Sequence, residues 1–412
     1  MQPAAGFNEG CFENGGRVSD LVAANANLMT PVVAPNLRIG WLGHKSQTIG
    51  DGLRTYSRNV TAGLADRGAD IVFLHHEPEL EDGRSSFSLR GTPVFQRRLV
   101  IARGGSRTRL EHILREQRVD VAHLSAPFST LDFGIPRLCH RVGIPVVVTF
   151  HVPFATARSI WSALSSAVYR LYARALADCD HVIVLGNAQR NLLFDLGVPE
   201  ERITVLSNGV DLEKYSPGPS TALEAFGARR LFCFFGRIDP EKGVETLVRS
   251  FLDVSPPPTT RLAIVGDGVD LARLRRRYAD QRIVFTGAIL DEQRRIEILR
   301  ASDGFFLPSL VEAQSLALLE AMACGLAVVA TAVGNHTEVL DGAGAVLNPN
   351  HLRDELRSTI RDLIDSPERC RAMGSRARAR ALELFAIEAH IDGLLATYGA
   401  VIGRARTSNV GR

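Results

Sequence analysis

Apolar runs alternate with amphipathic segments along most of this 412-residue chain. In the segment that ends near Arg67, for example, Tyr56, Val60 and Leu64 recur with the spacing of one helix face. Strands that alternate with helices indicate a parallel sheet covered by helices on both faces. The first half predicts strands at 37–43, 70–75, 119–125, 145–151 and 181–186, and helices at about 54–67, 107–117, 133–142, 159–177 and 188–196.

The alternation stops at Ser207–Ser220, where Asn-Gly and two prolines are typical of turns and linkers. It then restarts, with strands expected at 231–235, 261–265, 282–285, 304–308 and 327–330. Helices are expected between these strands and over 351–405. The predicted organisation is a mobile leader (1–36), a first α/β domain (37–207), a linker (208–220), a second α/β domain (221–385), and a C-terminal helix and tail that could pack back on the first domain (386–412).

Composition excludes several classes of protein. Hydrophobic residues make up 45% and charged residues 23% of the chain, as in globular proteins. There is no apolar run of ~18 residues that would span a bilayer, and residues 1–30 do not have the pattern of a secretory signal. The six cysteines fit neither a zinc site nor a disulfide framework, so we expect a cytoplasmic protein.

The region 90–118 is strongly basic, with eight arginines and two glutamates in a chain whose net charge is only +3. This region predicts contact with an anionic acceptor or with the anionic inner surface of the membrane. The alternative is a charged surface that only contacts solvent. Aromatic residues are scarce there, so we do not expect nucleic-acid binding.

The segment Phe235–Gly243 contains the clearest anion-binding pattern. A predicted strand runs into Gly236, Arg237 follows, and Lys242 precedes the next helix. A guanidinium and an ammonium on one strand-to-helix loop suit the two phosphates of a diphosphate. Only three of the 48 basic residues are lysines, so a lysine here runs against the bias of the chain.

A second pattern follows the predicted strand at 304–308. Glu312 lies in a loop, and Glu320 lies about two turns into the next helix. Ser315 and Leu316 fall at the start of that helix, where free N–H groups can bind phosphate. A carboxylate beside such a site can accept hydrogen bonds from sugar or ribose hydroxyls.

Three weaker signals come from His151 and from two glycine-bearing loops. His151 ends an apolar strand, where it could contact a substrate hydroxyl or be structural. Gly52 precedes a helix, and Gly266 and Gly268 follow a strand. These glycines permit close approach of a ligand or simply form tight turns. The loop at Gly266 lacks the third glycine of a dinucleotide-binding fingerprint, which weighs against an oxidoreductase.

Taken in order, these segments resemble the family-four retaining glycosyltransferases of group 1 type. The matching motifs are Thr-Phe-His151, Ser-Asn-Gly-Val-Asp211, Gly-Arg237 with Lys242-Gly, Val-Gly-Asp-Gly268, Leu-Pro-Ser309, the Glu312/Glu320 pair and Glu-Ala-Met-Ala-Cys-Gly325. The resemblance implies the GT-B fold, in which two Rossmann-like domains carry parallel sheets that face each other across a cleft. It implies transfer of a hexose-type sugar from a UDP- or GDP-linked donor to a hydroxyl of a glycan, lipid or small molecule.

The resemblance also implies a role for each motif residue. Arg237 and Lys242 would neutralise the diphosphate without a metal or other cofactor, Glu320 would hold the ribose, and Glu312 would contact the donor sugar. His151 would line the junction between sugar and acceptor. The sequence departs from the family at Ala313-Gln314-Ser315, where Gln314 would add a hydrogen bond to the sugar donor. It also departs at Val152 and Asp51, which leaves Gly52 as the contact in the first loop.

Two alternatives share these features. A nucleotide-sugar epimerase has the same fold but matches the glutamate pair less well. A non-catalytic protein that binds sugar nucleotides would not need Arg237, Lys242 and Glu320 together.

Overall fold

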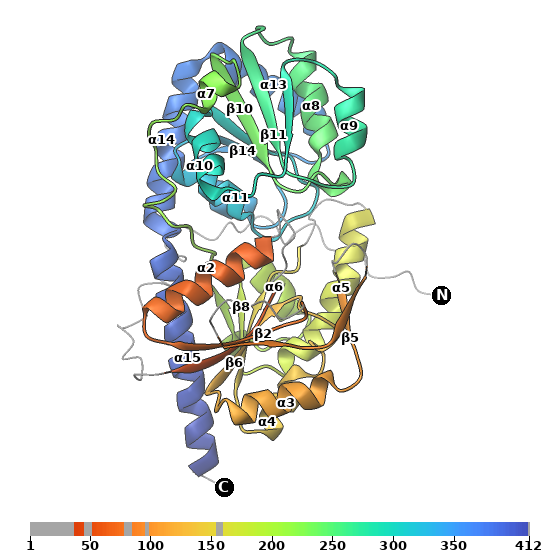
Figure 1. Ribbon diagram of the computed structural model, residues 1–412, viewed down its shortest axis with the longest axis vertical. Coiled ribbons are helices and arrows are strands. Elements are labelled where there is room, and N and C mark those ends of the chain that lie inside the picture. The colour runs from red at the N-terminus through yellow and green to blue at the C-terminus, as the bar shows by residue number, and fades with distance from the viewer. Residues whose placement is uncertain (1–36, 45–51, 78–84, 95–98, 154–159, 411–412) are drawn as a thin grey trace.

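The computed structural model describes residues 37–44, 52–77, 85–94, 99–153 and 160–410. The predicted leader 1–36 and residues 48–51 of the first glycine loop lie outside this part of the chain. The described residues form two α/β domains, one above the other along the long axis of the molecule (Figure 1). Each domain contains one parallel sheet.

The N-terminal sheet has seven strands in the order β3-β2-β1-β6-β7-β8-β9, and neighbouring strands run parallel. Its strands are β1 (Arg38–Leu42), β2 (Asp70–His75), β3 (Ser86–Ser88), β6 (Val121–Ala126), β7 (Val146–Phe150), β8 (His181–Val184) and β9 (Ile203–Val205). The helices of this domain are α2 (Gly52–Asp66), α3 (Ser106–Glu116), α4 (Ile135–Arg141), α5 (Ile160–Ala177), α6 (Asn187–Asp195) and the 3-10 turn η2 (Glu200–Arg202). A separate antiparallel hairpin joins β4 (Gly91–Val94) to β5 (Leu99–Ala102).

The C-terminal sheet has six parallel strands in the order β12-β11-β10-β13-β14-β15. Its strands are β10 (Arg230–Phe235), β11 (Thr260–Val265), β12 (Ile283–Gly287), β13 (Gly304–Leu307), β14 (Ala327–Thr331) and β15 (Ala345–Leu347). Its helices are α7 (Ala222–Ala225), η3 (Pro240–Lys242), α8 (Val244–Asp253), α9 (Leu271–Arg277), α10 (Glu292–Ala301), α11 (Leu316–Ala323), α12 (His336–Leu340), α13 (Leu352–Asp365) and α14 (Pro367–Leu384).

Burial explains why the apolar runs become strands. Residues 231–235 of β10 and all of β14 are buried, because helices cover both faces of the sheet. The sequence predicted these strands but missed β3, β4, β5, β9 and β15. Each of these has only three or four residues, and β3, β4, β9 and β15 are not buried throughout. Strands this short and this exposed leave no long apolar run in the sequence.

The C-terminal helix α15 (Ile387–Val410) lies along the N-terminal domain (Figure 1). Its buried side chains, among them Leu394 and Tyr398, share one apolar cluster with Val60 and Leu64 of α2 and with β1. At Gly63 the two helices approach so closely that an added Cβ would lie within 3.0 Å of Ile391.

The chain crosses between the domains twice, and the two crossings are hydrogen-bonded to each other. Val210 N donates to Phe385 O over 2.8 Å, and Ile387 N donates to Val210 O over 3.1 Å. The linker and the start of α15 therefore form a short parallel bridge. None of the described helices combines the length and the apolar character needed to cross a bilayer.

The contact between α2 and α15 yields a stability prediction. We expect Gly63→Val to lower the free energy of unfolding by about 1–3 kcal/mol, because the new side chain overpacks against Ile391. Gly399→Ala on α15, where an added Cβ meets nothing within 4 Å, should be neutral or slightly stabilising. Urea denaturation of both variants tests this, and equal stability of the two would contradict the packing described here.

Candidate active site

Arg237 lies on the loop that follows β10, and two acidic side chains hold it in place. Its Nη1 donates to Asp239 Oδ2 over 2.6 Å, and its Nη2 donates to Glu241 Oε1 over 3.3 Å. The two carboxylates are only 5% and 6% exposed, whereas the Arg237 side chain is 34% exposed. Part of the guanidinium therefore remains accessible to a ligand while the rest is fixed.

The loop that contains Gly266 and Gly268 packs directly on this arginine loop. An added Cβ at Gly266 would lie within 3.0 Å of Gly236 O, and one at Gly268 would lie equally close to the backbone of Ile238. Gly266 also has a φ of 146°, which disfavours other residues. In this structure, both glycines serve the packing of one loop on the other.

Lys242 forms an ion pair with Glu312, and each side chain is 13% exposed. The pair forms because Gly243, with a φ of 66°, brings the end of η3 against the carbonyl of Pro308 at the end of β13. Ser309 Oγ donates to the same carboxylate over 3.1 Å. Burial raises the pKa of Glu312, but the charges of Lys242 and His336 and the hydrogen bonds from Lys242 and Ser309 together hold the pKa below its usual range.

Gln314 contacts the linker between the domains. Its Nε2 donates to Ser207 Oγ over 2.6 Å, and its Oε1 accepts from Asn208 N over 2.7 Å. Both ends of the amide are therefore hydrogen-bonded to the linker. Ser315 caps α11 by accepting from Leu318 N, and Leu316 is the first residue of the helix.

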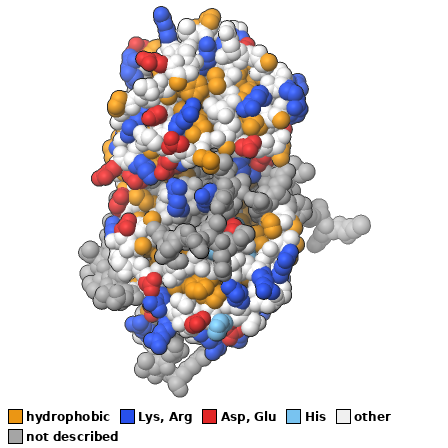
Figure 2. Space-filling model, in the orientation of Figure 1, with side chains coloured by type: hydrophobic (Ala, Val, Ile, Leu, Met, Phe, Trp, Pro, Cys, Tyr) orange, Lys and Arg blue, Asp and Glu red, His pale blue; other side chains and the backbone are white. Residues whose placement is uncertain are grey.

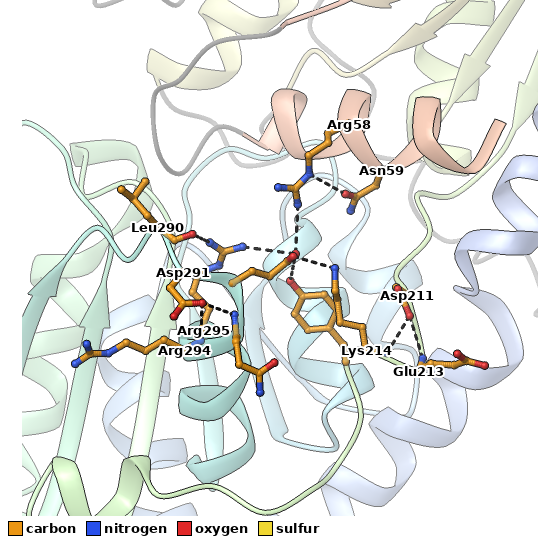
Figure 3. A network of polar contacts seen from close by, with 12 residues as sticks. Arg58, Asn59, Asp211, Glu213, Lys214, Leu290, Asp291, Arg294 and Arg295 are labelled. Carbon is orange, nitrogen blue, oxygen red and sulfur yellow. Dashed lines mark hydrogen bonds and ion pairs between the residues drawn. The ribbon is translucent and has the colours of Figure 1, made fainter. Parts of the chain in front are cut away.

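Glu320 lies on α11, and its carboxyl interacts with Tyr215, Glu292 and Arg295. These three residues belong to a charged network that joins the two domains (Figure 3). At the centre of the network is Glu292, which accepts from Arg58 of α2 over 3.3 Å and from Lys214 over 2.9 Å. Tyr215 donates to Glu292 over 3.2 Å and also interacts with Glu320. Burial raises the pKa of Glu320 to about 7, although nearby Arg295 acts in the opposite direction.

His151 is buried in the N-terminal domain, where its ring meets the edge of Tyr56 at a centroid distance of 4.4 Å. Among the described residues, its Nε2 has no hydrogen-bond partner. Burial, together with His390 and His44, lowers the pKa of His151 to about 3, so its imidazole is neutral near pH 7. Gly52 is exposed at the start of α2.

The structure thus brings Lys242 and Glu312 together and places Arg237 on the same loop as Lys242. His151 and Gly52 lie on the other domain. Sequence reasoning missed the carboxylates that hold Arg237, the charged network around Glu292, and His336, which lies near Glu312 and Lys242. Asp239 and Glu241 were visible inside the motif of Arg237, but no pattern in the sequence pointed to His336.

Comparison with known proteins identifies the family. The profile described as Glycosyltransferase Family 4 matches residues 50–214, and the one described as Glycosyl transferases group 1 matches residues 229–366. The chain belongs to this family of glycosyltransferases. The prediction made from the ordered motifs is therefore confirmed.

Relatives at the sequence level include the D-inositol 3-phosphate glycosyltransferases of Mycolicibacterium smegmatis and Segniliparus rotundus. The first is 31% identical over 65% of this chain and 64% of the relative. The second is 30% identical over 64% of this chain and 62% of the relative. The chain spans between about half and two thirds of the length of the curated relatives it matches.

Solved structures confirm the predicted GT-B fold. Sucrose-phosphate synthase from Thermosynechococcus elongatus has a TM-score of 0.70 at 19% identity, with 90% of this chain and 100% of that chain covered. HepE from Anabaena, solved in complex with UDP-glucose, has a TM-score of 0.67 at 18% identity and the same coverage.

The raised pKa of Glu320 predicts a pH-dependent loss of stability. A carboxyl whose pKa rises from its usual value of 4.5 to about 7 on folding stabilises the folded state below its unfolded pKa. That contribution is lost as the pH rises toward and through 7. We therefore expect Glu320→Gln to gain thermal stability relative to the wild type between pH 5 and pH 8.

Melting temperatures of both proteins across this pH range provide the measurement. Glu368→Gln is a matched control on α14, because the Glu368 side chain is 79% exposed. A difference between Glu320→Gln and wild type that stays constant from pH 5 to pH 8 would contradict the desolvation of Glu320.

Proposed function

We propose that the chain is a retaining glycosyltransferase that moves a hexose-type sugar from a UDP- or GDP-linked donor to a hydroxyl acceptor. The observation that carries this proposal is a pair of cations on one loop, Arg237 and Lys242. Arg237 is held by two buried carboxylates of the same loop, and Lys242 is held by the largely buried Glu312 of the neighbouring loop. Such a loop at the carboxyl end of a parallel strand is where this class of sheet binds nucleotides. The relatives named as glycosyltransferases, and the neighbour solved with UDP-glucose, support the same assignment.

In the proposed reaction, the bond between the sugar C1 and the β-phosphate oxygen breaks. Arg237 and Lys242 stabilise the negative charge that grows on the departing diphosphate. The acceptor oxygen forms its bond to C1 on the face that the diphosphate leaves, and its proton passes to a phosphate oxygen. The nucleoside diphosphate and the glycoside are the only products.

The other residues bind and orient the sugar donor. Among the described residues, Lys242 and Ser309 both bond to Oε1 of Glu312, which leaves Oε2 for a sugar hydroxyl. Glu320 binds the ribose. The neutral imidazole of His151 offers Nε2 to a hydroxyl at the junction with the acceptor, as a hydrogen-bonding group rather than an acid. Gly52, Gly236, Gly266, Gly268, Ser315 and Leu316 bring the backbone close to the donor.

Two side chains take the place of a divalent metal in this proposal, because the charge that a metal would neutralise is met by Arg237 and Lys242. We therefore propose that the reaction requires no cofactor. The structure describes no group of three or more His, Cys, Asp or Glu side chains that could hold a metal ion.

Assays with UDP-, GDP- and ADP-sugars test the function. We expect one donor to raise the melting temperature and to release its nucleoside diphosphate, and EDTA to leave the rate unchanged.

Lys242→Ala and Arg237→Ala should each lower the rate by about 10²–10³-fold, because each removes charge stabilisation of the leaving group. Arg357→Ala, an exposed arginine of α13, is the control. Full activity and donor affinity in both loop variants would refute the diphosphate assignment.

We propose further that the acceptor side of the protein contacts an anionic membrane. Arg90, Arg103 and Arg107 are exposed, and Ile101 and Phe133 beside them are 46% and 39% exposed. The hairpin and the loop of Phe133 are held together, because Thr130 N donates to Val100 O over 3.0 Å. Figure 2 shows Lys and Arg side chains next to hydrophobic ones on the half of the molecule that carries α3. Arginines around exposed apolar side chains suit a surface of acidic lipid headgroups.

Liposome flotation tests this contact. The protein should float with phosphatidylglycerol vesicles and remain unbound with phosphatidylcholine, because the attraction is electrostatic. Reversing two charges in Arg103→Glu/Arg107→Glu should abolish flotation. Reversing two exposed arginines of α13, in Arg353→Glu/Arg357→Glu, should not. Failure of the wild type to bind either vesicle would remove the membrane contact.

A further inference from the structure

His336 is a fully buried histidine beside the proposed diphosphate site that has no role in the reaction described above. It is the first residue of α12, and its Nδ1 lies 3.0 Å from the carbonyl oxygen of Thr331. Because a carbonyl only accepts, Nδ1 carries the hydrogen. Nε2 is then a lone-pair acceptor, and it has no hydrogen-bond partner among the described residues. A buried acceptor without a partner destabilises the fold.

Two charged groups act on this imidazole. They are Glu312, from the loop before α11, and Lys242, from the end of η3. The backbone places the start of α12 against the loop of Glu312, because Asn335 N donates to Ala313 O over 3.0 Å and an added Cβ at Gly334 would lie within 3.0 Å of Glu312 O. The strand β14 contributes only the Thr331 carbonyl. Glu338, on the same helix as His336, is used elsewhere, since its carboxylate accepts from Asn187 N and Ala188 N of α6. The environment of His336 is therefore set by the ion pair of the proposed donor site.

The charges of that site are unbalanced before any ligand binds. Arg237 and Lys242 are matched against three carboxylates, those of Asp239, Glu241 and Glu312. A diphosphate brings further negative charge, and Lys242 must then share its ammonium between Glu312 and the phosphates. Because the site excludes much of the solvent, the extra charge is poorly screened. The neutral imidazole of His336 lies beside Glu312, where it can accept a proton and offset the added negative charge.

We propose that His336 is a positioning residue that takes up a proton when a nucleoside diphosphate sugar binds. The imidazolium then stabilises Glu312 in place of Lys242, so that Lys242 can turn to the phosphates. This inference rests on the proposed function, because it requires the diphosphate to bind at Lys242. Burial lowers the pKa of His336 and Lys242 acts in the same direction, while Glu312 raises it. Drawing Lys242 toward a phosphate therefore favours the proton.

Calorimetric titration of the whole chain measures the proton directly. UDP-glucose and GDP-mannose are suitable probes, because their phosphates are both esterified and bind no proton near pH 7. The titration is repeated at pH 6.5 in buffers that differ in their enthalpy of ionisation. The slope of the binding enthalpy against the ionisation enthalpy of the buffer gives the number of protons taken up. We expect roughly one proton per bound donor for the wild type.

The matched variants are His336→Asn and His181→Asn. Asparagine places its amide near the position of Nδ1, so His336→Asn keeps a donor to Thr331 while removing Nε2. We expect this variant to show no proton uptake and to bind the probe about tenfold more weakly, which corresponds to one pKa unit of linked charge. His181 of β8 is also buried with an unpartnered ring nitrogen, but it lies in the other domain, so His181→Asn should behave as wild type.

The outcomes separate the two proposals. Binding of a probe to the wild type without proton uptake overturns the role of His336 and leaves the proposed function standing. Proton uptake that persists in a folded His336→Asn and disappears in Glu320→Gln assigns the proton to Glu320. This result also overturns the role of His336. Absence of binding by both probes overturns this inference and counts against a UDP- or GDP-linked donor. If His336→Asn does not fold, a wild-type slope of zero still overturns the proposal, and uptake that survives in Glu320→Gln supports it.

Discussion

The buried ion pair between Lys242 and Glu312 is the contact on which the proposed site depends. An ammonium at 13% exposure loses most of its hydration, and only a close carboxylate can offset that loss. The sheet topology supplies the carboxylate, because β10 and β13 are neighbours and their following loops leave the same edge. The backbone reinforces the meeting of these loops, since Leu310 N donates to the carbonyl of Glu241 over 2.8 Å. The loop of the cations and the loop of Glu312 thus form one unit.

That unit is connected to the rest of the molecule through the linker between the domains. Gln314, two residues after Glu312, bonds to Ser207 and Asn208. The carbonyl of Ser207 in turn lies 2.7 Å from His390 Nδ1 on α15, and His390 Nε2 lies 3.1 Å from the hydroxyl of Tyr56. Tyr56 packs on His151. A connected series of polar groups therefore runs from the proposed sugar-donor loop to the proposed acceptor side.

The fold was largely predictable from the sequence, because fully buried strands such as β10 leave continuous apolar runs. The short strands β3 and β15 were not predictable, since partner strands and not their own sequence determine them.

In the site, the resemblance selected Arg237, Lys242 and Glu312. The roles of Asp239 and Glu241 depend on how one loop curls back on itself, which spacing alone does not specify. The contact of Gln314 with the sugar donor stays a prediction, and its bonds to the linker were not predictable, because the partner is more than a hundred residues away. His336 reaches the site only through the packing of α12, so no local pattern could reveal it.

A crystal structure of the chain with its bound nucleoside diphosphate sugar tests the central claim most directly. The account predicts that the phosphates lie within hydrogen-bonding distance of both the Lys242 ammonium and the Arg237 guanidinium. Phosphates bound away from this loop, or bound while Lys242 remains paired with Glu312 alone, would contradict it.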